Sequence, residues 1–260
     1  MAADVSKSRV HFAGNPYPGG HGIAKFEWTA RLDSDGLFFD FHLESEEYGA
    51  DDEDEDDEDE EDSDEDDSEE DSSYREYDST RDWKAKIVWG NYHKCTLSST
   101  YWGDNSGIRL DGEEKLHLEG LQGLTLRANT LPPNYDPEDV EEDDDGDEYG
   151  MEGPPAFHVY LLGHDSVADH AITFTEKFGF AEYAINWTGK IALSYFGEYD
   201  YRYDFKIQIA RAKLQYIKVP EDCDETKARE LLAQAIVEGT QPDKFEWTEL
   251  DGKRGFSVCG

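Results

Sequence analysis

The first part of the chain carries an alternation of apolar and polar residues that predicts a β-hairpin. Residues 23–32 and 37–43 alternate on either side of a segment, 33–36, made of turn-forming residue types. Successive strand residues point to opposite faces, so the second strand should have one apolar and one polar face. The apolar face holds Phe39, Phe41 and Leu43, and the polar face holds Asp40 and His42.

Similar patterns recur along the rest of the chain and predict a mainly β protein. The fold class that we expect is an antiparallel β-sandwich, or paired β-sheets built of hairpins, with one helix near the C-terminus. The further predicted strands lie at 83–97, 116–126 (two short strands), 157–162, 171–174, 183–195 and 201–219, with a last hairpin at 245–258.

A single helix is predicted at about residues 224–238. Asp224 is a suitable N-cap, apolar residues recur at helical spacing between 231 and 236, and Gly239 follows as a stop signal.

Acidic residues interrupt this pattern in two places. Residues 51–71 hold 19 acidic side chains and residues 136–152 hold 11, and neither segment contains Lys or Arg. Like charges at this density repel one another, and there is little apolar surface to bury. We therefore predict two disordered acidic insertions, at 45–80 and 134–153.

The rest of the chain has the composition of an ordinary globular protein, although the formal net charge of the whole is −39. We expect residues 1–260 to form a single β-rich domain or two closely packed β subdomains, at about 1–131 and 154–260. The composition does not determine the oligomeric state.

The acidic segments favour a function in binding a positively charged partner. Dense carboxylates attract cationic proteins and speed their encounter, whereas the phosphates of nucleic acid would be repelled. The competing interpretation is a solvated linker that only keeps the protein soluble. The candidate contact residues are Asp51, Asp52, Glu53, Asp54, Glu55, Asp56, Asp57, Glu58, Asp59, Glu60, Glu61, Asp62, Asp64, Glu65, Asp66 and Asp67.

The leading hypothesis is thus a non-enzymatic protein that neutralises or chaperones a basic protein: a toxin, a nuclease, a histone or a ribosomal protein. A histone-chaperone-like protein would hold its cargo with the acidic segments. An immunity-protein-like inhibitor would bind through its folded face, and the acidic segments would steer the approach.

Two alternatives come from other residues. An enzyme site could be assembled from dispersed groups, of which the first to consider are Asp40, His42, His93, His164 and Asp204.

The second alternative is calcium binding. The residues Glu141, Asp143, Asp145 and Glu152 fall at positions 1, 3, 5 and 12 of a calcium-loop pattern. Glutamate at the first position and flanking prolines are atypical, so diffuse binding of divalent cations is the stronger expectation. No other cofactor is indicated.

The cysteines and the N-terminus bear on the compartment. The three cysteines are far apart and form no CxxC pair, which is typical of a reducing environment. The first residues lack the pattern of a secretory signal, and no apolar run approaches the length of about 18 residues that spans a membrane. We expect a cytoplasmic protein, or a nuclear one in a eukaryote, without membrane contact.

Overall fold

The computed structural model describes residues 6–33, 36–48, 83–100, 107–110, 115–136, 154–250 and 253–260. Within them the fold is mostly antiparallel β-sheet with a helix near the C-terminus, which confirms the predicted class. None of the described helices is long and apolar enough to cross a membrane.

The described strands all belong to one sheet. Their bounds are β1 Arg9–Phe12, β2 His21–Asp33, β3 Gly36–Ser45, β4 Thr96–Ser98, β5 Ile108–Arg109, β6 Thr125–Ala128, β7 His158–Tyr160, β8 His164–Gly179, β9 Glu182–Ala192, β10 Tyr203–Lys218, β11 Phe245–Leu250 and β12 Lys253–Val258. The helices are α1 Lys86–Trp89 and α2 Glu225–Ala235, with short 3-10 turns η2 Leu118–Gly120, η4 Ser194–Phe196 and η5 Val237–Thr240.

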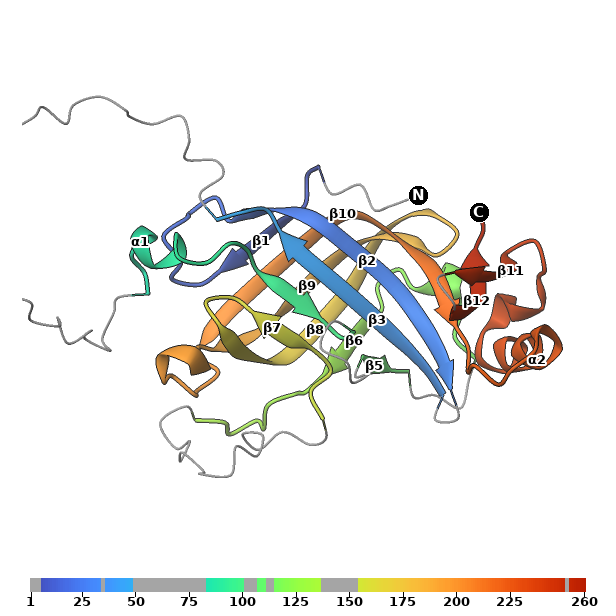
Figure 1. Ribbon diagram of the computed structural model, residues 1–260. Helices are drawn as coiled ribbons and strands as arrows, with labels where there is room; N and C mark the ends of the chain where they lie inside the picture. The colour runs from blue at the N-terminus through green and yellow to red at the C-terminus, as the bar shows by residue number, and fades with distance from the viewer. Residues whose placement is uncertain are drawn as a thin grey trace, which may run out of the picture.

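The sheet closes on itself. Its path runs β2-β3-β4-β7-β8-β9-β10, and β10 returns to the start by pairing with β1 in antiparallel and with β2 in parallel orientation. Figure 1 shows the consequence: β2 and β3 cross in front of β8, β9 and β10, so that two parts of one sheet face each other. In the same view α1 lies at one end of the fold, and α2 lies with β11 and β12 at the other.

Large aromatic side chains fill the space between the facing parts. Trp28 of β2 packs against Phe174 of β8 with ring centroids 5.0 Å apart, and Phe41 of β3 packs against Trp187 of β9 at 5.9 Å. These strand pairs are not neighbours in the sheet, so the contacts cross the interior. All four side chains are at most 1% exposed. Burying about 150–250 Å² each at about 25 cal/mol per Å² gives up to about 4–6 kcal/mol per ring.

Strand β10 has ladder partners along both of its edges. On one edge it pairs with β9 and then with β12, and on the other with β1 and then with β2. Its side chains alternate as predicted: Phe205, Ile207 and Ile209 are buried, and Lys206 and Gln208 are exposed.

Other predicted elements are also confirmed. The hairpin of β2 and β3 keeps a regular register from Phe26↔Leu43 to Asp33↔Gly36, and β11 and β12 form the predicted last hairpin. Helix α2 begins after Asp224, whose side chain accepts a 2.8 Å hydrogen bond from the Lys227 backbone N–H. It ends at Ala235, before the predicted residue 238, because Ile236 is extended and bridges to Leu116.

Two predicted strand segments were wrong in part. Within 83–97 the structure has helix α1, and only the end of the segment enters a strand, β4. The Trp89 side chain is fully buried, and its indole N–H donates a 2.7 Å bond to the Trp83 carbonyl. Tertiary burial therefore overrides the strand preference of this aromatic sequence. Within 116–126 the first predicted strand is the turn η2, and only the second is a strand, β6.

The two predicted acidic insertions fall mostly outside the described residues, which omit 49–82 and 137–153. The candidate contact residues at 51–67 and the four candidate calcium ligands lie in these omitted ranges. Their disorder and their roles stay predictions.

A buried histidine makes the fold sensitive to acid. His170 of β8 is 0% exposed, and its Nδ1 accepts a 3.2 Å hydrogen bond from the Trp187 indole. Burial lowers the pKa of His170 to about 3, against about 6.5 in an unfolded chain. Above about pH 6.5 both states hold His170 neutral. As the pH falls from about 6.5 towards 3, only the unfolded state takes up the proton, so stability is lost.

We expect His170→Asn, which keeps an acceptor for Trp187 but does not titrate, to weaken this dependence. The free energy of unfolding should fall by about 2 kcal/mol less between pH 7 and pH 5 in the variant than in the parent. Urea unfolding at the two pH values measures this, with the exposed His164→Asn as control. Parallel pH dependence in parent and His170→Asn would contradict the assignment.

Candidate functional site

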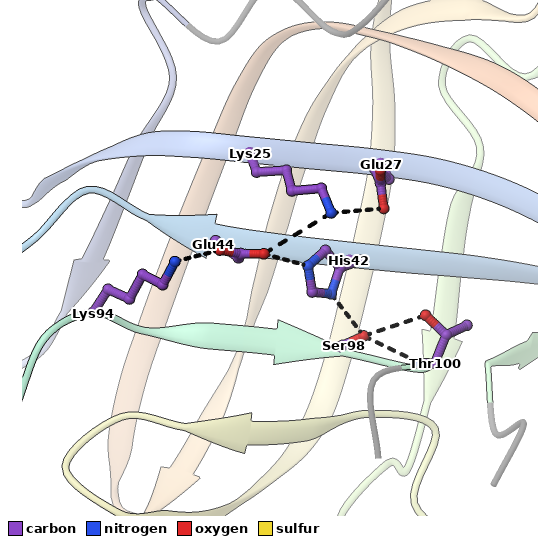
Figure 2. Close-up of polar contacts among 7 residues, drawn as sticks. All are labelled: Lys25, Glu27, His42, Glu44, Lys94, Ser98 and Thr100. Atoms are coloured by element: carbon purple, nitrogen blue, oxygen red, sulfur yellow. Dashed lines mark hydrogen bonds and ion pairs between the residues drawn. The ribbon is translucent and has the colours of Figure 1, made fainter. Parts of the chain in front are cut away.

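The polar face of the β2–β3 hairpin carries a connected set of charged and hydroxyl side chains (Figure 2). Alternation along β3 places His42 and Glu44 on the face opposite Phe41 and Leu43. Pairing of β3 with β4 sets Ser98 directly across from His42.

A chain of hydrogen bonds runs through His42. Its Nδ1 lies 3.0 Å from the Ser98 hydroxyl oxygen, and its Nε2 lies 2.9 Å from Oε1 of Glu44. The Thr100 backbone N–H donates to the same Ser98 oxygen at 3.1 Å. Because the ionised Glu44 carboxylate can only accept, the hydrogen of this contact lies on Nε2 of His42.

Glu44 is the charged centre of this set. The Lys94 ammonium lies 2.5 Å from Oε2, and the Lys25 ammonium lies 3.9 Å from Oε1. Hydrogen bonds from Lys94 and then from His42 lower the pKa of Glu44 to about 2. The carboxylate is therefore ionised throughout the neutral range, and lysine cations balance its charge.

The order hydroxyl, imidazole, carboxylate is also that of a nucleophilic catalytic site. Its burial argues against that use, because Ser98 is 0% exposed and His42 only 6%. Two grooves of the described surface, of about 490 and 430 Å³, are lined by other residues. A substrate has no access to the Ser98 oxygen, and the hydrogen bonds instead join β3 to β4.

A second buried polar cluster lies two residues earlier on β3. Asp40 lies 3.4 Å from Nε of Arg31 and accepts a 3.1 Å hydrogen bond from Ser99. Burial raises the pKa of Asp40 in spite of the nearby Arg31 cation. Gly107, at φ +70°, covers this carboxylate so closely that a Cβ at this position would lie 2.3 Å from Oδ1.

The structure brings together only two of the five residues considered for a dispersed enzyme site, Asp40 and His42 on β3. His93 has an 89% exposed side chain beside Glu47, and His164 is exposed at the start of β8. Asp204 of β10 forms a 2.9 Å ion pair with Lys190.

Of the seven side chains in Figure 2, only His42 was a sequence-predicted candidate, and its partners Glu44 and Ser98 and the cation Lys94 were all missed. Glu44 continues the alternation of Asp40 and His42, which was a usable signal. Ser98 meets His42 only through the β3–β4 register, which no local pattern specifies.

Two grooves on the described surface lie away from this set. One, of about 490 Å³, lies between β5, β6 and the end of α2, where the side chains of Arg109, Lys115 and Arg127 gather among leucines. The other, of about 430 Å³, lies on β1, β9 and β10 and contains the Lys190–Asp204 pair. Among the described residues, no group of three or more His, Cys, Asp or Glu side chains is arranged to hold a metal ion.

Aromatic residues fix the chain next to both acidic segments. Tyr48, just before the first segment, is buried and donates its hydroxyl to the Leu161 carbonyl at 3.1 Å. Trp83, just after it, packs edge-on against Tyr203 at 4.8 Å. Tyr135, just before the second segment, accepts a 2.7 Å hydrogen bond from the Tyr201 backbone N–H.

The described residues are almost neutral. They include 24 acidic and 22 basic side chains, so 39 of the 63 acidic residues and only 2 of the 24 basic ones lie elsewhere in the chain. The described residues and the acidic segments therefore differ strongly in net charge.

No protein-family model, curated protein or solved structure matches this chain.

The burial of Ser98 leads to a direct prediction. A fluorophosphonate that labels accessible activated serines should leave Ser98 unmodified in the native protein, because the reagent cannot reach the hydroxyl. Intact mass and peptide mapping measure the label, and a known serine hydrolase serves as positive control. Labelling of Ser98 that the Ser98→Ala variant abolishes would show an accessible nucleophile and refute the structural role.

Replacement of Glu44 should destabilise the fold. Glu44→Gln removes the charge that Lys94 and His42 stabilise, and we expect a loss of about 1–3 kcal/mol at pH 7. Because the pKa of Glu44 is lowered, its contribution is complete above about pH 4.5 and lost as the pH falls towards 2. The difference between parent and variant should therefore shrink in acid.

Urea unfolding of both proteins measures this difference. The matched control is Glu249→Gln, whose 2.9 Å ion pair with Arg254 is largely exposed and should matter by less than about 0.5 kcal/mol. Equal effects of the two substitutions at pH 7 would contradict the special role of Glu44.

Proposed function

We propose that this chain is a non-enzymatic binding protein that uses its acidic segments to neutralise or chaperone a basic protein. The observation that carries the proposal is the separation of charge along the chain: residues 51–71 and 136–152 hold 30 of the 63 acidic residues and no Lys or Arg, and the rest holds 33 acidic and 24 basic ones. A solubility device needs no such separation, since charges spread over the surface serve equally well.

The electrostatics favour a cationic macromolecule as the partner. A segment with 19 carboxylates in 21 residues creates a strong local potential that attracts basic surfaces. Its attraction is screened over about 8–10 Å at physiological salt, so binding should weaken as salt is raised. Toxins, nucleases, histones and ribosomal proteins all present suitable basic surfaces.

The attachment of the two acidic segments supports a joint role. Trp83, which follows the first segment, packs on Tyr203, and Tyr135, which precedes the second, is hydrogen-bonded to Tyr201. Tyr201 and Tyr203 are two residues apart, so the chain re-enters the described fold at Trp83 close to the place where it leaves it after Tyr135. One basic partner is then within reach of both, which raises the effective concentration of carboxylates.

The cysteines bear on the compartment in which the protein acts. Cys95, Cys223 and Cys259 are all free thiols, and the first two are buried. This supports a reducing compartment, and we assign the protein to the cytoplasm, or to the nucleus in a eukaryote.

Replacement of residues 51–71 by a Gly/Ser linker of equal length tests the proposal. With core histones as the basic probe, we expect weaker binding and a smaller slope of log Kd against log salt, because fewer ions are exchanged on binding. Fluorescence anisotropy at several salt concentrations gives both quantities. The matched control inserts the same linker length while keeping 51–71 intact.

The outcome also separates the two versions of the proposal. Loss of the complex supports holding by the acidic segments, whereas slower association with a retained complex supports binding by the folded face with electrostatic steering. If the parent shows no salt-sensitive binding to histones or to any basic protein of its host, the proposal is refuted.

A further inference from the structure

The larger groove lies at a break in the closed sheet. Strand β5 pairs only with β3, and β6 pairs only with β8, so the described part of the chain contains no ladder that joins β5 to β6. Both strands lie off the closed path, β5 along β3 and β6 along β8 (Figure 1). The groove of about 490 Å³ is lined from this break to the end of α2.

The floor and walls of the groove are aliphatic. Leu37 and Ile108 form buried parts of it, at 4% and 3% exposure. Leu116 and Leu126 are half-buried, and Leu124 is 38% exposed, one of the few large apolar side chains so exposed among the described residues. Exposed aliphatic surface inside a concave site is typical of a binding site for an apolar group.

The polar lining of the groove is cationic. Arg109, Lys115 and Arg127 all border it, and no Asp or Glu is among its described lining residues. Lys115 uses one of its three N–H donors on the Ala233 carbonyl, at 2.5 Å. Arg127 is exposed and forms no ion pair with any described carboxylate. Among the described residues, three cationic side chains therefore lie around this groove.

We propose that this groove binds an amphiphile with one carboxylate and an aliphatic chain. The chain would lie on the leucine walls, and the carboxylate would lie near Lys115 and Arg127. The volume is within the range of about 300–1,000 Å³ that is usual for small-molecule sites.

The lining selects this ligand class over other anions. The described residues that line the groove include no aromatic side chain on which a nucleobase would stack. A peptide with several acidic residues would meet the repulsion of the whole chain, whereas a single carboxylate meets the least. The inference concerns a different surface from the acidic segments, so it stands or falls independently of the proposed basic partner.

Titration calorimetry of the full chain with decanoate, below its micelle concentration, tests the proposal. We expect saturable one-to-one binding, with decanol, which has the same chain and no charge, at least tenfold weaker. The double substitution Lys115→Gln and Arg127→Gln should reduce the decanoate affinity at least tenfold, because it removes both cations. Leu124→Ser should weaken decanoate and decanol alike.

The matched control is Lys190→Gln with Lys206→Gln, which removes two cations from the other groove and should leave decanoate binding unchanged. Circular dichroism of each variant checks that it is folded. Absence of saturable binding to the folded parent overturns the proposal. So does equal affinity for decanoate and decanol, or a decanoate affinity that the Lys115/Arg127 double variant retains.

Discussion

The rest of the fold depends on the two-sided hydrogen bonding of β10. A strand in the middle of a closed sheet must pair its backbone groups along both edges, since unpaired buried groups are costly. Strand β10 meets this requirement with β9 and β12 on one edge and β1 and β2 on the other. Its parallel pairing with β2 brings the first hairpin over the later strands, and this encloses the interior where Trp28 meets Phe174. This closure also sets the positions of two sites: the polar face of β3 with His42 and Glu44, and the groove between β5 and β6.

Most of the negative charge of the chain lies outside the described residues. The described residues nearly balance acid and base, so repulsion between like charges is small among them. The buried Tyr48 and Trp83 and the half-buried Tyr135 are the described aromatic side chains nearest the acidic segments, and the contacts of Trp83 and Tyr135 are with Tyr203 and Tyr201. Charged side chains among the described residues pair with near neighbours. Hydrogen bonds from Lys94 and His42, for example, lower the pKa of Glu44 and keep it ionised.

Local patterns predicted the elements with strong periodicity. The hairpin of β2 and β3, the alternation of β10 and the N-cap of α2 were all readable, because each depends on residues close in sequence. Helix α1 was missed since Trp83 and Trp89 resemble strand residues, and only tertiary burial makes them part of a helical turn. The closure of the sheet, the contact of His42 with Ser98 and the cationic groove all arise from pairings between distant segments. No single-sequence pattern specifies such registers.

The central claim is that the fold is independent of the acidic segments. Amide hydrogen exchange tests it most directly, in a variant in which Gly/Ser linkers replace both 51–71 and 137–152. The account predicts that the amides of β10 keep the protection that they have in the full chain, because every ladder of that strand involves described residues outside the deleted segments. Loss of β10 protection in the variant would show that the acidic segments are part of the folding unit and would contradict the account.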